Sequence, residues 1–213
     1  MKKHTRIIAF FITLVIATTA LCSCGSSVDI DEIREVLSDL IPKSEELNVI
    51  YFGEGLPISS DRELVEKFYS SFDSDIEMIN YHPVDPDCGY TSEDEIRAAT
   101  LEVFTAEYSE YLFERAFNGI SATLGEGTDS QTNVSAIYAM YIMQKNTLTV
   151  RLDLADEAIP LGRVYDISAA EIVRTRGNYV VVSVPSTFDG KSEDIELKLV
   201  KTPDGWRLDS PTY

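Results

Sequence analysis

The spacing of apolar residues divides the chain into an N-terminal part with helical periodicity and a C-terminal part with strand alternation. From Ile30 to Ile41 apolar residues recur every three or four positions, which predicts one buried face of a helix. Pro42 is expected to end or kink this helix, because proline lacks the backbone N–H that a helix interior uses. The segment from Phe52 to Pro57 predicts a turn.

Cap residues predict the starts of three further helices. Ser60 precedes Glu63, and Ser92 precedes Glu95, each with the spacing of a capping box. Thr105 is expected to cap a shorter helix. The residues predicted to face inward are Leu64, Val65, Phe68 and Phe72 after the first cap, Ile96, Ala99, Thr100, Val103 and Phe104 after the second, and Tyr108, Tyr111, Leu112 and Ala116 after the third.

Residues 80–90 contain two prolines and a glycine and predict an ordered loop or an edge strand. A loop is expected over 125–133, which is polar and glycine-bearing. Residues 136–143 are apolar in both alternating sets, which predicts a central strand covered on both faces. Residues 147–154 alternate apolar with polar and predict a strand with one solvent-facing side.

Two turn signals predict hairpins in the last third of the chain. Gly177-Asn178 separates strands expected over 166–174 and 179–184. Pro203-Asp204-Gly205 separates strands expected over 193–201 and 206–208. Helices followed by antiparallel strands predict an α+β fold, in which N-terminal helices precede a curved antiparallel meander. This order of elements is similar to the cystatin-like and NTF2-like folds, whose helices pack into the concave face of a bent sheet.

The beginning of the chain has the pattern of a secretory signal. A basic head precedes an apolar run from Ile7 to Ala20, which is shorter than the roughly 20 residues that cross a membrane. The next four residues, Leu21-Cys22-Ser23-Cys24, resemble the lipobox of bacterial lipoproteins. The resemblance implies cleavage before Cys24, lipid on that cysteine, and attachment to the extracytoplasmic face of the cell membrane. Cleavage at another site and retention as an uncleaved anchor are the alternatives.

The expected organisation is therefore a signal peptide over 1–23, a tether and N-terminal helix over 24–58, and an α+β domain over 59–213. The chain carries 18 basic and 36 acidic residues, a formal net charge of −18. Removal of 1–23 takes away Lys2, Lys3 and Arg6 and no acidic residue, which leaves 15 basic against 36 acidic residues and a charge of −21. This excess argues against nucleic acid and anionic head groups as ligands and suits a solvated domain or a basic partner.

The side chains that usually carry metal binding or nucleophilic catalysis are few. After the lipid-bearing cysteine the chain has one histidine, His82, and one thiol, Cys88, so no internal disulfide is expected. Both lie in a loop with Asp85 and Asp87, but a fourth zinc ligand is missing. Ile96 stands where a calcium loop that begins at Asp85 would place its closing glutamate. We therefore expect no metal and no cofactor, and a structural role for the thiol.

A narrower resemblance covers residues 81–213. Tyr81-His82-Pro83, and the segment 92–104 ahead of Thr105-Ala106-Glu107-Tyr108, are similar to the opening of the IseA family of secreted inhibitors of cell-wall DL-endopeptidases. The resemblance implies a non-catalytic protein that docks on a hydrolase and blocks its site. No inhibitory residue is carried over, because no motif matches residue by residue.

Four residues are predicted to bind a partner. Tyr108 and Tyr111 belong to a group of aromatic residues that can stack on sugar rings or receive a partner loop. Arg163 and Asp166 lie in a segment expected to be an exposed loop. The expected function is a lipid-anchored extracytoplasmic binding protein that regulates a cell-wall hydrolase without catalysis of its own. The alternatives are a module that holds a small apolar or sugar ligand in the bent sheet, and a glycosidase that uses paired carboxylates.

Overall fold

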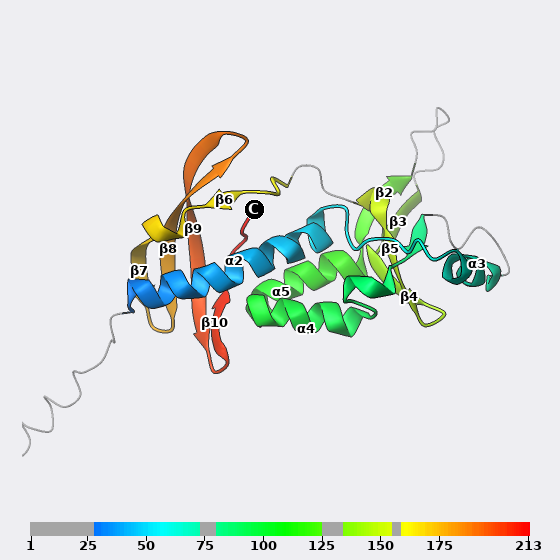
Figure 1. Cartoon of the computed structure of the whole chain (residues 1–213), viewed down its shortest axis with the longest axis horizontal. Coiled ribbons are helices and arrows are strands. Elements are labelled where there is room, and N and C mark those ends of the chain that lie inside the picture. Colours follow the sequence, from blue (N-terminus) through cyan, green and yellow to red (C-terminus); the bar gives the residue numbers. More distant parts are fainter. Residues whose placement is uncertain (1–27, 73–79, 125–133, 155–158) are drawn as a thin grey trace, which may run out of the picture.

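The structure is a computed structural model, and it describes residues 28–72, 80–124, 134–154 and 159–213, with the backbone alone for 120–124 and 134–138. The predicted α+β class is confirmed. Figure 1 shows α2 (Ile30–Phe52) along the length of the molecule, with the strands β7 to β10 across its N-terminal end. Helices α4 and α5 lie beside its C-terminal half, and the smaller strands β2 to β5 lie beyond its C-terminal end. The expected loop over 125–133 lies outside the described residues.

Of the two effects expected of Pro42, an end or a kink, the end is wrong, since α2 continues to Phe52. An interior proline costs a helix about 3 kcal/mol. The buried face continues beyond the proline with Leu47, Ile50 and Tyr51, and each large apolar side chain contributes about 1.5–3 kcal/mol on burial. Pro42 itself is exposed. Burial of the second half of the helix therefore outweighs the lost backbone hydrogen bond.

The helix α3 (Arg62–Ser70) begins after Asp61, so the predicted cap at Ser60 is wrong. The Asp61 carboxylate accepts hydrogen bonds from the backbone N–H groups of Glu63 and Leu64, at 2.9 and 3.3 Å. A carboxylate at this position satisfies first-turn donors and also complements the helix dipole. Ser60 has no such bond among the described residues.

The other two predicted caps are confirmed. Ser92 caps α4 (Glu93–Val103), and its hydroxyl accepts from the N–H of Glu95 at 3.3 Å. Thr105 caps α5 (Ala106–Phe113), which runs on into a π-helical turn, η3 (Glu114–Asn118). Most predicted inward residues are buried, but Tyr111 is 52% exposed, so its expected inward position is wrong. It lies on the outer side of α5, beyond the ring of Tyr108.

The strands form three antiparallel sheets among the described residues. The first has the order β1-β5-β4, the second pairs β2 with β3, and the third has the order β10-β9-β8-β6, with β7 also paired to β8. The strand bounds are β1 Tyr81–Pro83, β2 Ile120–Leu124, β3 Val134–Tyr138, β4 Tyr141–Gln144, β5 Thr147–Arg151, β6 Val164–Tyr165, β7 Glu171–Arg176, β8 Tyr179–Phe188, β9 Lys191–Thr202 and β10 Gly205–Leu208. The predicted edge strand within 80–90 is confirmed as β1, which η2 (Pro86–Cys88) follows.

The predicted covered strand over 136–143 is wrong, because the chain turns between β3 and β4 at Ala139 and Met140. Both turn residues are buried, so the apolar run of the sequence continues through the turn and does not mark where the strand ends. The turn carbonyls have partners: the Tyr81 hydroxyl donates to the carbonyl oxygen of Ala139 at 2.7 Å, and the N–H of Arg151 donates to that of Met140 at 2.8 Å. Strand β4 then lies at the edge of its sheet.

The solvent-facing side predicted for 147–154 is also wrong. Thr149 and Arg151 are buried, and the strand β5 ends at Arg151, ahead of the short helix η4 (Leu152–Leu154). The Thr149 hydroxyl donates to the carbonyl oxygen of Ile142 at 2.9 Å. The Arg151 guanidinium donates to both carboxylate oxygens of Asp153, at 2.7 and 2.9 Å. These bonds satisfy the polar groups without solvent.

Both predicted hairpins are confirmed as the β7–β8 and β9–β10 connections. A third hairpin joins β8 to β9 through Asp189 and Gly190, whose φ angles of 48° and 71° are those of a tight hairpin turn. The strands β7 to β10 therefore form the expected meander. Strand β7 begins at Glu171, after the short helix η5 (Ile167–Ala169), rather than at 166.

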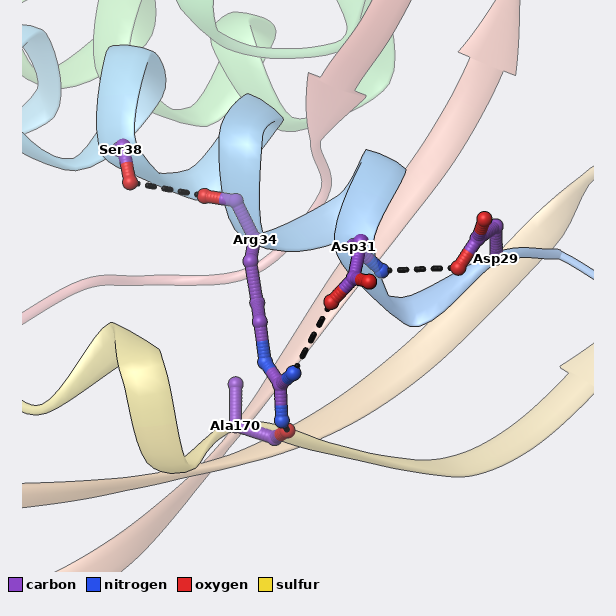
Figure 2. Close-up of polar contacts among 5 residues, drawn as sticks. All are labelled: Asp29, Asp31, Arg34, Ser38 and Ala170. Carbon is purple, nitrogen blue, oxygen red and sulfur yellow. Dashed lines mark hydrogen bonds and ion pairs between the residues drawn. The ribbon is translucent and has the colours of Figure 1, made fainter.

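Polar contacts hold α2 against this meander. Figure 2 shows Arg34 reaching from α2 to the carbonyl oxygen of Ala170, to which it donates at 2.9 Å. The same guanidinium pairs with Asp31 at 3.1 Å, and Asp29 caps the helix by accepting from the N–H of Asp31. The start of α2 is thus fixed on the loop ahead of β7.

Candidate functional site

The four residues predicted to bind a partner fall in two separate places. On α5 the half-buried ring of Tyr108 lies 5.0 Å from that of Phe104 and 6.3 Å from that of Tyr111. Burial raises the pKa of Tyr108 well above its usual range, so its phenol stays neutral and serves as a hydrogen-bonding group. Tyr111 adds an exposed aromatic face at the same place.

Arg163 and Asp166 flank the short strand β6. Arg163 is not an exposed loop residue: it is 6% exposed and donates to the Ser186 hydroxyl at 3.1 Å and to the Glu193 carboxylate at 2.6 Å. Asp166 is exposed, and its carboxylate accepts from Ser168 at 2.6 Å. No contact among the described residues joins this pair to Tyr108 or Tyr111. Cys24, the predicted lipidation site, lies outside the described residues.

His82 lies in β1 and Cys88 ends η2, and both side chains have hydrogen-bonding partners within the fold. His82 Nδ1 lies 3.1 Å from the Tyr69 hydroxyl, and the Cys88 thiol donates to the carbonyl oxygen of Tyr90 at 3.4 Å. Asp85 accepts from the N–H of Asp87 and so caps η2. Among the described residues no group of three or more histidines, cysteines or carboxylates has the geometry to hold a metal ion. Within the same ranges no helix is both long and apolar enough to span a membrane.

A surface hollow that the sequence did not predict lies at the C-terminal end of α2. It has a volume of about 620 Å³ and is lined by Val49 of α2, by residues 54–58 and by Leu152 of η4. Three of its apolar side chains are exposed: Val49 by 43%, Ile58 by 44% and Leu152 by 38%. Glu54 is the charged residue in the lining. We call this site the distal hollow.

The path of the turn at 53–58 creates the distal hollow. Gly55 has a φ of 76° and lies so close to the β4–β5 sheet that a Cβ atom would come within 2.9 Å of the Met140 Cε atom and of the Tyr141 hydroxyl. That hydroxyl accepts from the N–H of Leu56 and donates to the carbonyl oxygen of Ile50, both at 2.9 Å. The turn is therefore clamped to the sheet beneath it, which leaves the apolar side chains of the rim facing outward.

Two backbone bonds fix the far side of the turn. The N–H of Ser59 donates to the carbonyl oxygen of Pro83, and the N–H of Asp85 donates to that of Pro57, both at 2.8 Å. The rim of the distal hollow thus belongs to a segment held at both ends. Its exposed apolar groups are presented on a rigid frame, which limits the entropy lost when a ligand binds.

A second depression lies between α2, the end of α4 and β10. It has a volume of about 530 Å³, and its lining includes the apolar residues Val36, Leu40 and Trp206. Its charged residues are of both signs: Glu35, Asp39 and Glu102 are acidic, and Lys43 and Arg207 are basic. We call it the α2–β10 groove.

No protein-family model matches the chain, and no curated protein matches it either. The two surface sites are therefore interpreted from their own chemistry. The distal hollow offers exposed apolar area beside one carboxylate, and the α2–β10 groove offers paired and unpaired charges above an apolar floor.

Proposed function

We propose that the chain is a lipid-anchored extracytoplasmic binding protein whose distal hollow receives a segment of a partner protein, and that this partner is a cell-wall hydrolase. The observation that carries the proposal is the grouping of Val49, Ile58 and Leu152 as exposed apolar side chains around one hollow. Scattered apolar residues are normal on a surface, whereas apolar side chains gathered at a concave site are typical of docking surfaces.

The acidic charge of the chain favours a partner with basic residues. The expected mature chain has 15 basic and 36 acidic residues, a net charge of −21, and Glu54 lies in the lining of the distal hollow. A partner segment that combines a large apolar side chain with neighbouring basic residues would complement both features. The apolar side chain would fill the hollow, while the basic residues would speed the encounter through long-range attraction.

The position of the distal hollow suits an anchored protein. Cys24, the expected lipid carrier, precedes the start of α2 at Ile30 by six positions. Val49 lies nineteen positions further along the same helix, which corresponds to about 28 Å at 1.5 Å per residue. The helix would thus hold the docking surface away from the membrane, on the side where cell-wall enzymes work.

The hydrolase as partner rests on the resemblance of residues 81–213 to the IseA inhibitors. In that proposal the chain blocks its target by occupying the target's site with the exposed apolar rim. The small-ligand alternative has an observation of its own, in the α2–β10 groove.

The test uses the mature chain with Cys24→Ser, so that no lipid is attached, and a panel of purified cell-wall DL-endopeptidases. Association is followed by surface plasmon resonance, and inhibition by release of peptides from cell walls. Ile58→Asp and Leu152→Asp should each weaken binding at least about tenfold, because each removes apolar contact and would bury a carboxylate against the apolar side chain of the partner. Val173→Asp is the control, since Val173 is an exposed valine on β7.

Ionic strength supplies an independent readout. The association rate should fall as salt rises, because the acidic surface steers a basic partner. Absence of any bound hydrolase, a rate that ignores salt, or equal weakening by Val173→Asp would contradict the proposal. The anchor is tested separately by palmitate labelling of the full chain: Cys24→Ala should abolish the label, whereas Cys22→Ala should retain it.

A further inference from the structure

The α2–β10 groove contains charged groups that the fold leaves without opposite partners. Arg207 donates to the carbonyl oxygens of Leu101 and Trp206, at 3.0 and 2.9 Å. It forms no ion pair with any carboxylate that the structure describes. These two bonds occupy part of the guanidinium and fix its plane, while its remaining N–H groups are free for a further acceptor.

The carboxylates of the groove divide into paired and unpaired ones. Asp39 pairs with Lys43 at 2.8 Å, one turn apart on α2, so these two charges offset each other. Glu35 and Glu102 are exposed, and within the described ranges neither has a hydrogen bond or an ion pair from its side chain. The groove therefore presents one fixed cation and two carboxylates that can each accept a cation.

The floor between these charges is apolar and fixed. Leu40 and Trp206 are buried, and Val36 is half-buried beside them. The Trp206 indole N–H donates to the Glu32 carboxylate at 2.8 Å, and the Lys201 ammonium lies 5.0 Å from the centre of its ring. The indole is thus held in one orientation, and the floor is ready to receive an apolar side chain without rearrangement.

We propose that the α2–β10 groove binds a short peptide with free ends. The peptide carboxylate would pair with Arg207, its ammonium with Glu35 or Glu102, and an apolar side chain would lie over Leu40 and Trp206. A guanidinium fork matches a carboxylate in two parallel hydrogen bonds. The volume of about 530 Å³ falls within the range of small-molecule sites, about 300–1,000 Å³.

Ligands of a single charge fit this groove less well. A simple anion would meet the repulsion of Glu35, of Glu102 and of a mature chain of net charge −21. A simple cation would leave Arg207 without a carboxylate partner and would meet its repulsion. A zwitterion matches both signs, and a dipeptide adds the apolar side chain that the floor accepts. This inference is independent of the proposed docking at the distal hollow, because the two sites share no residue.

The test titrates the mature chain carrying Cys24→Ser with the dipeptide alanyl-leucine and follows binding by isothermal calorimetry. N-acetyl-alanyl-leucine lacks the ammonium, and alanyl-leucine amide lacks the carboxylate. A charge-assisted hydrogen bond is usually worth enough to change affinity by about tenfold or more. We therefore expect saturable binding of the dipeptide, and affinity at least about tenfold lower for each capped form.

Variants assign the ends of the peptide. Arg207→Lys keeps the charge and loses the fork, so it should weaken the dipeptide and leave the weak binding of the amide unchanged. The double change Glu35→Gln and Glu102→Gln should weaken the dipeptide but not its N-acetyl form. Both glutamates are exposed, so the double variant should keep the fold and can test the proposal even if Arg207→Lys does not fold. Arg176→Lys, on the exposed end of β7, is the matched control.

Different results of the titrations support and contradict the proposal. Saturable binding that weakens in the groove variants and not in Arg176→Lys supports the proposal. Absence of saturable heat, equal affinity for the amide and the free dipeptide, or equal loss in Arg176→Lys would overturn it. A positive result here with no hydrolase binding would leave this site standing while it removed the proposed docking function.

Discussion

The phenol of Tyr141 donates a hydrogen bond to the carbonyl oxygen of Ile50 across 2.9 Å, and so ties strand β4 to the last turn of α2. The same oxygen accepts from the N–H of Leu56 at 2.9 Å. Both bonds are buried, and Tyr141 is almost fully enclosed. One side chain thus fixes the end of the long helix and the turn that follows it, and that turn forms the rim of the distal hollow.

Tyr141→Phe should lower the free energy of unfolding by about 2–4 kcal/mol. The change removes two buried hydrogen bonds and leaves the N–H of Leu56 and a carbonyl oxygen to be satisfied elsewhere, at about 1–3 kcal/mol for each unsatisfied group. Urea unfolding followed by circular dichroism measures the difference. Tyr111→Phe, at the exposed tyrosine of α5, should change stability by no more than about 0.5 kcal/mol. Equal stability of the two variants would show that the clamp contributes nothing.

Gly55→Ala should destabilise the chain more than Gly177→Ala. Both glycines have positive φ, 76° and 60°, so an L-residue costs about 1–2 kcal/mol at either position. A Cβ at Gly55 also comes within 2.9 Å of Met140 and Tyr141, whereas at Gly177 it meets nothing within 4 Å. The crowding should add about 1–3 kcal/mol at Gly55. Thermal unfolding of both variants tests this, and identical losses would mean that the turn can lift off the sheet freely.

Asp61→Ala should cost about 1 kcal/mol of stability, because the first turn of α3 loses the acceptor for two backbone N–H groups. Ser60→Ala should stay within about 0.5 kcal/mol, since Ser60 does not cap the helix. Chemical unfolding of the pair decides which residue is the cap. A larger loss for Ser60→Ala would restore the capping box expected from the sequence.

Local signals predicted the parts of the fold that local chemistry determines. Ser92 and Thr105 do cap their helices, and Gly177 does turn the β7–β8 hairpin, because each acts on neighbouring backbone groups. The wrong predictions concern positions whose structure depends on residues far away in the sequence. Nothing near Thr149 shows that its hydroxyl bonds to Ile142, and nothing in the apolar run around Met140 shows that the chain turns there. Burial against the rest of the fold is also the reason why α2 continues past Pro42.

The distal hollow was missed for the same reason. Val49, Ile58 and Leu152 come from three separate segments, and only the fold brings them to one place. One signal was available: Val49 is a valine on the polar side of α2, outside its buried face. The charge pattern of the α2–β10 groove gave no comparable signal, because Arg207 lies in the last strand and Glu35 in the first described helix. In contrast, the closeness of the Tyr108 and Tyr111 rings, which are tilted to each other at 6.3 Å, is what their spacing of three residues on one helix predicts.

Because of the hydrogen bonds to Glu32, the free energy of unfolding should fall as the pH is lowered. Its carboxylate accepts from the Lys201 ammonium and from the Trp206 indole N–H, both at 2.8 Å, and these bonds, the lysine first, hold the pKa of Glu32 below its usual value of 4.5. A group whose pKa is lower in the folded state stabilises the fold above its unfolded pKa, and that contribution is lost as pH falls through the folded pKa. Since the pair is half-exposed, the contribution should be about 0.2–1 kcal/mol.

Glu32→Gln should therefore be less stable than the unmodified chain at pH 7. The difference should shrink as the pH falls from about 4.5 through the lowered pKa of Glu32, where the folded carboxylate takes up a proton. Urea unfolding at a series of pH values from 7 to about 3 measures the difference. Lys201→Met removes the first partner, so the same comparison made in that background should give a flatter profile. A difference that stays constant or grows on acidification would show that Glu32 does not stabilise the contact between α2 and the β9–β10 hairpin through its charge.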